Sequence, residues 1–295
     1  IKSFPVDYYS FLARQRLEAL DIPPNFAASS DLEKNEVDMH PEVKRITELI
    51  NSQMPKRAVN AIEQVLNSKR KRQQLGPKDY VVLAKTAYDL KRHSLMNRAE
   101  KYRRERFPQT QHDAEEILAL YPQTYIYSIA DVAKKERVDA DLLLALAKNR
   151  SNFNSKMMAP TGELGLFQVN PESAARLFEE IFPEDNLSTK ALLDTEINAV
   201  LGARYMGRMW RALGKSLPLA LAAYHAGPGL LTHWHAQNQD VALDIFIEEL
   251  PYHHTQNFVR QVVSELARYR FARHMQETLE RTTSALTPAA TKKSL

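Results

Sequence analysis

Two neighbouring stretches decide the fold: residues 145–154 read ALAKNRSNFN, and residues 159–168 read APTGELGLFQ. The first stretch ends a segment in which leucines and alanines repeat at helical spacing, from Leu142 to Ala147, and form an apolar face. Asp139, directly before this segment, is a favoured N-cap residue. The pattern therefore predicts a helix that begins after Asp139 and carries Arg150 at its C-terminal end.

The two stretches resemble the first signature of the soluble lytic transglycosylase (SLT) family, which reads approximately A-x-x-x-x-E-S-x-F and then S-P-x-G-A-x-G-L-M-Q. Further blocks follow in the order and spacing of that family. Because several independent blocks agree over about 150 residues, the resemblance is specific. The further blocks are Pro171, Ser173 and Ala174; Asn198, Leu201, Gly202 and Tyr205; residues 219–229, LALAAYHAGPG; and residues 246–252, FIEELPY, with Phe258, Val259 and Arg260.

The resemblance implies an all-α fold, a lysozyme-like SLT domain preceded by a helical linker or superhelical segment. We expect this helical segment over residues 1–120, the SLT domain over residues 121–275, and a disordered tail over residues 276–295. Phe26–His40 is polar and is expected to be a loop. Amphipathic patterns predict helices over Asp7–Leu20, Pro41–Ser52, Lys56–Lys71, Lys78–Arg92, Leu95–Phe107 and Ile126–Glu136.

Family enzymes cleave the β-1,4 bond between N-acetylmuramic acid and N-acetylglucosamine in peptidoglycan and leave a 1,6-anhydromuramoyl end. In these enzymes one glutamate acts first as acid and then as base, and no metal or cofactor is implied. Arg150 stands where that glutamate is expected, directly before Ser151. A guanidinium keeps its proton at physiological pH and cannot cycle as acid and base. The resemblance therefore implies a pseudoenzyme with respect to the standard mechanism.

Three further departures lie in blocks that line the family groove. His225 replaces the asparagine of A-Y-N-A-G, and His254 and Gln256 replace the glutamate and arginine of E-T-R. These changes accompany Arg150 while the glycines, prolines and apolar positions of the blocks are retained. The pattern favours a groove released from catalysis on an intact scaffold.

The resemblance also assigns the expected contacts to peptidoglycan glycan strands. The alternative is that Phe153 and Tyr224 pack on the helices and Glu248 is a cap or ion-pair partner. The expected substrate-binding positions around Arg150 are Ser151, Phe153, Gln168, Tyr224, His225, Glu248 and His254.

Three functions stay open at this point. The first is a glycan-binding protein without standard catalytic activity. The second is an active lytic transglycosylase, in which Glu163 or Glu249 replaces the missing acid or in which Arg150 is an introduced residue. The third is a protein-interaction scaffold, in which residues 1–120 contact cell-wall or envelope protein partners.

The amino-acid composition limits the classes of binding partner that we expect. The 295 residues carry 40 basic and 36 acidic side chains, a formal charge of +4, which suits mild attraction to an anionic polymer and not a nucleic-acid specialist. Apolar stretches are shorter than the roughly 20 residues that cross a bilayer, so we expect no membrane span. The absence of cysteine excludes disulfides and thiolate metal ligands. Five histidines fall between His225 and His254 without a strong zinc spacing, so no metal is expected.

The cellular compartment follows only from the family resemblance, which implies the periplasm or cell envelope. The chain opens at Ile1 and shows no apolar signal segment. We therefore expect a processed or trimmed product.

Overall fold

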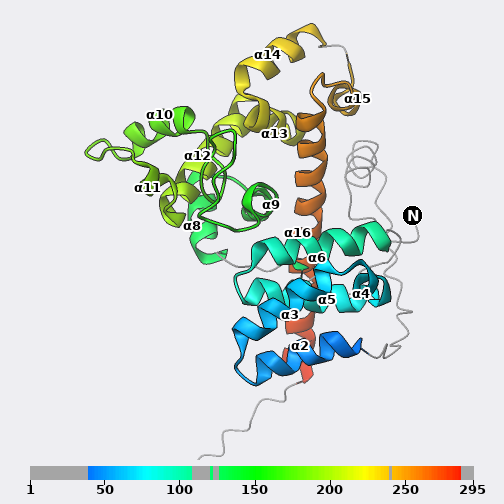
Figure 1. Ribbon diagram of the computed structural model, residues 1–295. Coiled ribbons are helices and arrows are strands. Elements are labelled where there is room, and N and C mark those ends of the chain that lie inside the picture. Colours follow the sequence, from blue (N-terminus) through cyan, green and yellow to red (C-terminus); the bar gives the residue numbers. More distant parts are fainter. Residues whose placement is uncertain (1–38, 108–119, 122–125, 239–240, 287–295) are drawn as a thin grey trace, which may run out of the picture.

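The computed structural model in Figure 1 describes residues 39–107, 120–121, 126–238 and 241–286. Within these ranges the chain is helical, and extended pairing is limited to two isolated bridges, Met158 with Leu164 and Leu164 with Val169. This confirms the all-α fold class. The helix predicted over Asp7–Leu20 and most of the loop predicted over Phe26–His40 lie outside the described residues.

The N-terminal helices lie together in one half of the molecule (Figure 1). Prolines occupy the first positions of three of them, where the missing N–H leaves no helical hydrogen bond unmade. The sequence predicted most of these helices close to their observed bounds. They are α2 (Pro41–Asn51), α3 (Pro55–Asn67), α4 (Lys69–Gln74), α5 (Pro77–Asp89) and α6 (His93–Arg106).

The single helix predicted over Lys56–Lys71 is wrong, because the chain breaks at Ser68. Ser68 has an extended backbone, with φ −86° and ψ 112°, and its hydroxyl accepts a hydrogen bond from the backbone N–H of Lys71 at 3.3 Å. A serine that caps one helix N-terminus also ends the helix before it. The basic run 69–72 therefore begins α4 and does not close α3.

The second half of the molecule surrounds one buried helix, α9 (Ala140–Ser151). The side chain of Asp139 accepts a hydrogen bond from the backbone N–H of Asp141 at 2.8 Å, so the predicted N-cap is confirmed. All side chains from Leu142 to Ala147 are buried, which makes α9 a core helix with no apolar-to-polar division along this stretch. The other helices of this half are α8 (Ile126–Glu136), α10 (Pro171–Ile181), α11 (Thr189–Leu192), α12 (Thr195–Ala212), α13 (Leu217–Ala226), α14 (Pro228–Gln237) and α15 (Leu243–Glu248).

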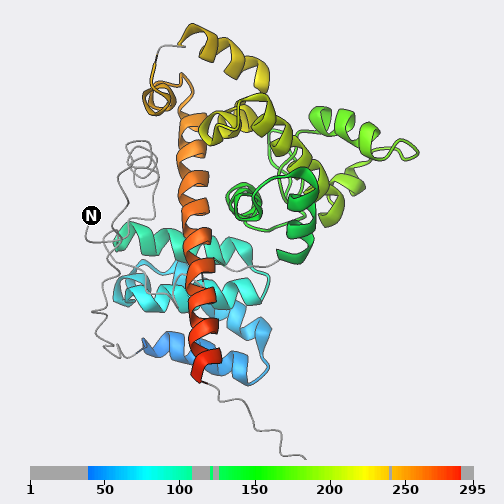
Figure 2. The ribbon, with the colours of Figure 1, turned by 180° about the vertical axis from the view of Figure 1, so that it is seen from behind.

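The last helix, α16 (His253–Leu286), runs the length of the molecule, from the end where α13 and α15 lie to the N-terminal helices (Figures 1 and 2). The tail predicted to start at residue 276 is therefore wrong as far as Leu286. No glycine or proline interrupts residues 253–286, so a helix anchored by packing at its start propagates at low cost.

One apolar cluster joins the two halves and includes residues such as Leu83 of α5, Leu144 of α9 and Val262 of α16. Tyr121 and Tyr269 meet edge to face in it, with ring centroids 5.3 Å apart. Among the helices that the structure describes, none combines the length and the hydropathy needed to cross a membrane.

Candidate functional site

Arg150 lies in the last turn of α9, half-buried, between a loop and α16. Its Nη2 donates a hydrogen bond to the carbonyl oxygen of Gln168 at 3.2 Å. Its guanidinium carbon lies 5.7 Å from the centre of the Phe258 ring, within cation–π range. Its Nε is buried and has no hydrogen-bond partner among the described residues. The positive charge is thus held in place with one donor unused.

The chain turns sharply after α9 because two consecutive residues adopt left-handed backbone conformations. Asn152 has φ 50° and Phe153 has φ 62°. Asparagine tolerates this region well, whereas phenylalanine needs a compensating gain. The Phe153 ring provides that gain, since it is 1% exposed and packs in the core. The structure thus places Phe153 in the core, which is the alternative that the sequence left open.

The loop between α9 and α10, residues 152–170, is held by side chains of the family blocks. Ser151 Oγ donates a hydrogen bond to Leu166 O at 2.6 Å, and Tyr224 OH donates one to Phe167 O at 2.9 Å. Gln168 Nε2 donates to Gly165 O at 2.7 Å and to Met157 O at 3.1 Å. Asn198 accepts a hydrogen bond from Phe167 N at 2.7 Å and donates to Leu164 O at 3.0 Å and Leu192 O at 2.8 Å. Three residues expected to contact a glycan therefore also set the shape of the loop.

Phe258 of α16 contacts several residues of the site from the side of this helix. The rings of Phe258 and Tyr224 are nearly parallel, at an interplanar angle of 7° and a centroid distance of 6.3 Å. The His225 ring stacks on Phe258 at 4.6 Å, and its Nδ1 lies 3.0 Å from the hydroxyl of Thr255. In the sequence, Phe258 stands out only as part of a family block. Its place one helical turn after Thr255 and His254 was the available signal that it shares their end of α16.

The electrostatics of the site leave Arg150 as its fixed charge. Burial, reinforced by the nearby Arg150 charge, lowers the pKa of His225 to about 4, so the imidazole is neutral at pH 7. Burial also raises the pKa of Tyr224, which keeps its proton. Glu163 acts on His225 in the opposite direction, and its carboxylate accepts a hydrogen bond from the Thr161 hydroxyl. The Glu163 carboxylate therefore acts electrostatically on His225, which lies beside Arg150.

The remaining predicted residues lie at the junction of α15 and α16. Glu248 pairs with Arg260, whose Nε lies 3.1 Å from Glu248 Oε1, so the ion-pair alternative is the one found. Gln256 is buried and donates to the carbonyl oxygen of Glu248, which ties the end of α15 to α16. His254 and Glu249 are exposed. In the described ranges no three histidine, aspartate or glutamate side chains gather in a way that could hold a metal ion.

Comparisons with known proteins locate the same region. Residues 128–247 match the family described as Transglycosylase SLT domain. The soluble lytic murein transglycosylase of Salmonella typhimurium is 27% identical over 161 residues, which cover 54% of this chain and 25% of that protein. The protein of the same description from Escherichia coli K12 is 28% identical over 153 residues, or 51% and 24% of the two chains. The chain spans about a quarter of the length of these relatives.

Solved structures extend the likeness in fold to the N-terminal helices. The 70 kDa soluble lytic transglycosylase from Escherichia coli superposes with a TM-score of 0.66 at 22% identity, over 90% of this chain and 41% of that one. An inactive mutant of the lytic transglycosylase Slt from Pseudomonas aeruginosa gives a TM-score of 0.64 at 22% identity, over 95% and 42%. The family match and the relatives in sequence thus support the transglycosylase SLT domain family for residues 128–247, and the solved structures support the same fold.

Proposed function

We propose that the protein binds peptidoglycan glycan strands and does not cleave them by the standard transglycosylase mechanism. The observation that carries this proposal is the guanidinium of Arg150, fixed on Gln168 O and over Phe258 at the position of the expected acid. The mechanism needs a group that gives a proton to the glycosidic oxygen and then takes one from a sugar hydroxyl. Arginine does neither near neutral pH.

The surroundings of Arg150 support binding better than turnover. Its guanidinium belongs to a half-buried side chain, and the part that solvent reaches can donate to a glycan oxygen or carboxylate. His225 is a neutral imidazole and so presents no second charge beside Arg150. Loss of general acid–base catalysis by itself removes a factor of about 10² to 10⁴ in rate. We therefore expect binding without measurable release of product.

The test uses purified sacculi with the full chain. We expect the protein to sediment with sacculi and to release no 1,6-anhydromuropeptides. The Arg150→Ala variant should sediment less, whereas Arg176→Ala, which removes an exposed arginine paired with Glu172 on α10, should behave like the wild type. Failure of the wild type to sediment would remove the binding proposal, and release of anhydro products would remove the proposed inactivity.

A second candidate is an active transglycosylase that uses Glu163. It is favoured by one observation, that the charge of Glu163 acts on His225 and opposes the lowering of its pKa. If Glu163 were the acid, sacculi digested by the wild type would yield anhydro products and Glu163→Gln would abolish them. Our leading proposal predicts no such products from either protein.

The compartment and the protein partners are proposals of the same kind. A ligand in the cell wall requires the protein in the periplasm or cell envelope, and fractionation of the source cells with marker enzymes tests this placement. The N-terminal helices share their fold with the solved transglycosylases. Cross-linking of the full chain in its own envelope would identify any partner of these helices.

A further inference from the structure

A cavity lies between the two halves of the molecule, away from the Arg150 site. It has a volume of 290 Å³ and is lined by α6, the end of α9 and α16. Its wall is polar, with the amides of Asn149 and Gln261 joined by a hydrogen bond of 3.1 Å. The volume is at the lower end of the range for small-molecule sites, which runs from about 300 to 1,000 Å³. The cavity therefore suits a ligand of the size of an amino acid or a dipeptide.

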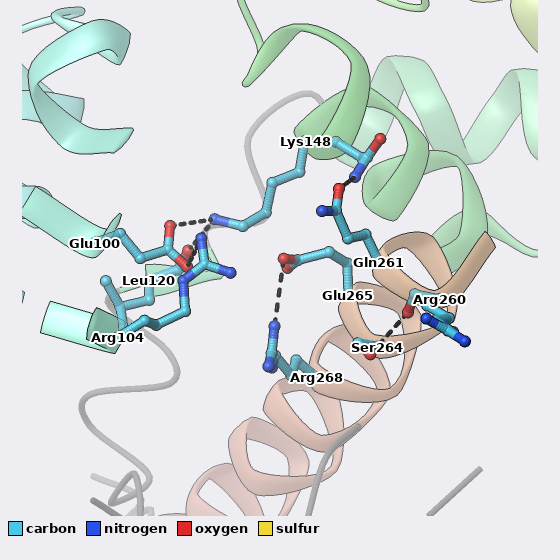
Figure 3. Close-up of polar contacts among 10 residues, drawn as sticks. Glu100, Arg104, Leu120, Lys148, Arg260, Gln261, Ser264, Glu265 and Arg268 are labelled. Carbon is cyan, nitrogen blue, oxygen red and sulfur yellow. Dashed lines mark hydrogen bonds and ion pairs between the residues drawn. The ribbon is translucent and has the colours of Figure 1, made fainter. Parts of the chain in front are cut away.

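The inner end of the cavity is marked by an incompletely satisfied carboxylate. Glu265 is 7% exposed, lines the cavity, and points from α16 toward Arg104 and Glu100 (Figure 3). Its Oε1 lies 3.3 Å from Nη1 of Arg268, whereas its Oε2 is buried and has no hydrogen-bond partner in the described part of the chain. A buried acceptor without a donor costs stability, so the Glu265 carboxylate is incompletely neutralised and favours a further positive group at the cavity wall.

The charged side chains that line the cavity become more exposed and less tightly paired from its interior to its mouth. Deep in the wall, Lys148 and Glu100 satisfy each other at 3.4 Å, with side-chain exposures of 3% and 4%. Toward solvent, the side chains of Arg104 and Lys101 are 49% and 68% exposed, and their carboxylate contacts are loose, at 3.6 and 3.7 Å. Two cations therefore stand at the mouth, and one carboxylate oxygen without a donor stands inside.

We propose that this cavity binds a small amino-carboxylate, a free amino acid or a dipeptide. The ammonium group of the ligand pairs with the carboxylate of Glu265, and its carboxylate lies between Arg104 and Lys101. The lining cations, Lys101, Arg104 and Lys148, exceed the lining carboxylates, Glu100 and Glu265, by one, which favours a ligand with a carboxylate. The site goes beyond the proposed glycan binding and shares no charged residue with it.

The experiment is calorimetric titration of the full chain with three probes. The probes are alanylalanine, its N-acetyl form, which lacks the ammonium group, and its C-terminal amide, which lacks the carboxylate. We expect alanylalanine to bind and each capped form to bind about tenfold or more weakly, because each loses a charge-assisted hydrogen bond. Equal binding of the N-acetyl form, or no heat from alanylalanine at millimolar concentration, would overturn the proposal.

Variants assign the two ends of the site. Glu265→Gln should weaken alanylalanine about tenfold and leave the already weak N-acetyl form unchanged, whereas Arg104→Gln should remove the discrimination against the amide. Glu249→Gln, an exposed carboxylate outside the cavity, is the matched control and should bind like the wild type. Unchanged affinity in Glu265→Gln would refute the site. If that variant fails to fold, the capped probes on the wild type still decide, and sedimentation with sacculi tests glycan binding separately.

Discussion

At the scale of single residues, the guanidinium of Arg150 changes the chemistry of its neighbours. It lowers the pKa of His225 together with burial, and it is held by a carbonyl that belongs to the loop beneath it. Tyr224, buried beside both, is committed to Phe167 O and retains its proton. Tyr224 and His225 thus form a neutral, hydrogen-bonded frame beside the fixed cation of Arg150, which supports the proposed binding of a ligand.

The pKa of His225 makes a prediction about stability and pH. The folded value of about 4 lies below the ordinary value of 6.5, so the unfolded chain binds a proton more readily than the folded one. The contribution of His225 is therefore present above pH 6.5 and is lost as the pH falls toward 4. Over this pH range the free energy of unfolding in urea should fall by up to about 2 kcal/mol more for the wild type than for His225→Asn, after allowance for solvent screening. A pH-independent difference would contradict this account.

Tyr224→Phe tests the role of the hydroxyl in the frame. It removes the donor to Phe167 O and leaves a buried carbonyl unsatisfied, so the free energy of unfolding should fall by about 1 to 3 kcal/mol. Tyr252→Phe, at a side chain that is 53% exposed, should change it by less than about 0.5 kcal/mol. Equal effects of the two substitutions would mean that the Tyr224 hydroxyl does not hold the loop.

The structural roles of some residues could be predicted from the sequence, and those of others only in part. The N-cap Asp139 and the end position of Arg150 follow from local pattern, which a sequence displays directly. The long-range partners of Tyr224, Gln168 and Ser151 depend on which backbone carbonyls the folded loop presents, and no periodicity carries that information. Their roles toward a glycan stay predictions.

At the scale of elements, the loop between α9 and α10 positions the site. It follows two left-handed residues and contains Gly165 at φ 79°, where an added Cβ would lie 2.4 Å from Asn198 Nδ2 and 2.5 Å from Leu192 O. The loop is thus pressed against the Asn198 amide that also holds it. Any side chain at residue 165 would separate the loop from α12.

Two glycines of this loop give a matched pair of substitutions. Gly165→Ala meets both a left-handed backbone and a close contact, and we expect it to lower the free energy of unfolding by about 2 to 5 kcal/mol. Gly162→Ala has φ 99° but open space around its Cβ, so only the backbone cost of about 1 to 2 kcal/mol applies. Thermal or urea unfolding of both variants checks the order, and a larger loss at residue 162 would contradict the packing argument.

Helix existence was predictable, and helix ends were less so. The break at Ser68 turns on one hydroxyl that caps α4, and the same residue type is tolerated inside helices elsewhere. The extension of α16 to Leu286 has a different cause. Its polar composition resembles a tail, and helical continuity comes from the packed turns before it, which the composition of the last residues does not show.

At the scale of the whole molecule, buried charges join the two halves. Lys148 of α9 donates to Glu100 of α6 at 3.4 Å and to Leu120 O at 3.0 Å (Figure 3). Its Nζ also lies 4.7 Å from the centre of the Tyr121 ring. Burial alone would raise the pKa of Glu100, but the charges of Lys148 and Arg104 outweigh it and lower the pKa to about 2. The two halves of the molecule are therefore joined between α6 and α9 by a pair that stays ionised.

Removing one member of this pair should lower the free energy of unfolding more than replacing both members. Lys148→Met leaves the Glu100 carboxylate buried without its main partner, and we expect a loss of about 3 to 5 kcal/mol in the free energy of unfolding. The double variant Lys148→Met with Glu100→Leu should lose less than the single variant, because no charge is then left unpaired. Additive losses would show that the two side chains act independently.

We propose that Arg150 permits glycan binding and prevents standard turnover. The most direct measurement is the release of 1,6-anhydromuropeptides from purified sacculi by the wild type and by Arg150→Glu, at matched amounts of sedimented protein. The account predicts no release by the wild type, and any release by the variant would show a site intact apart from its acid. Release of 1,6-anhydromuropeptides by the wild type would overturn the proposed inactivity.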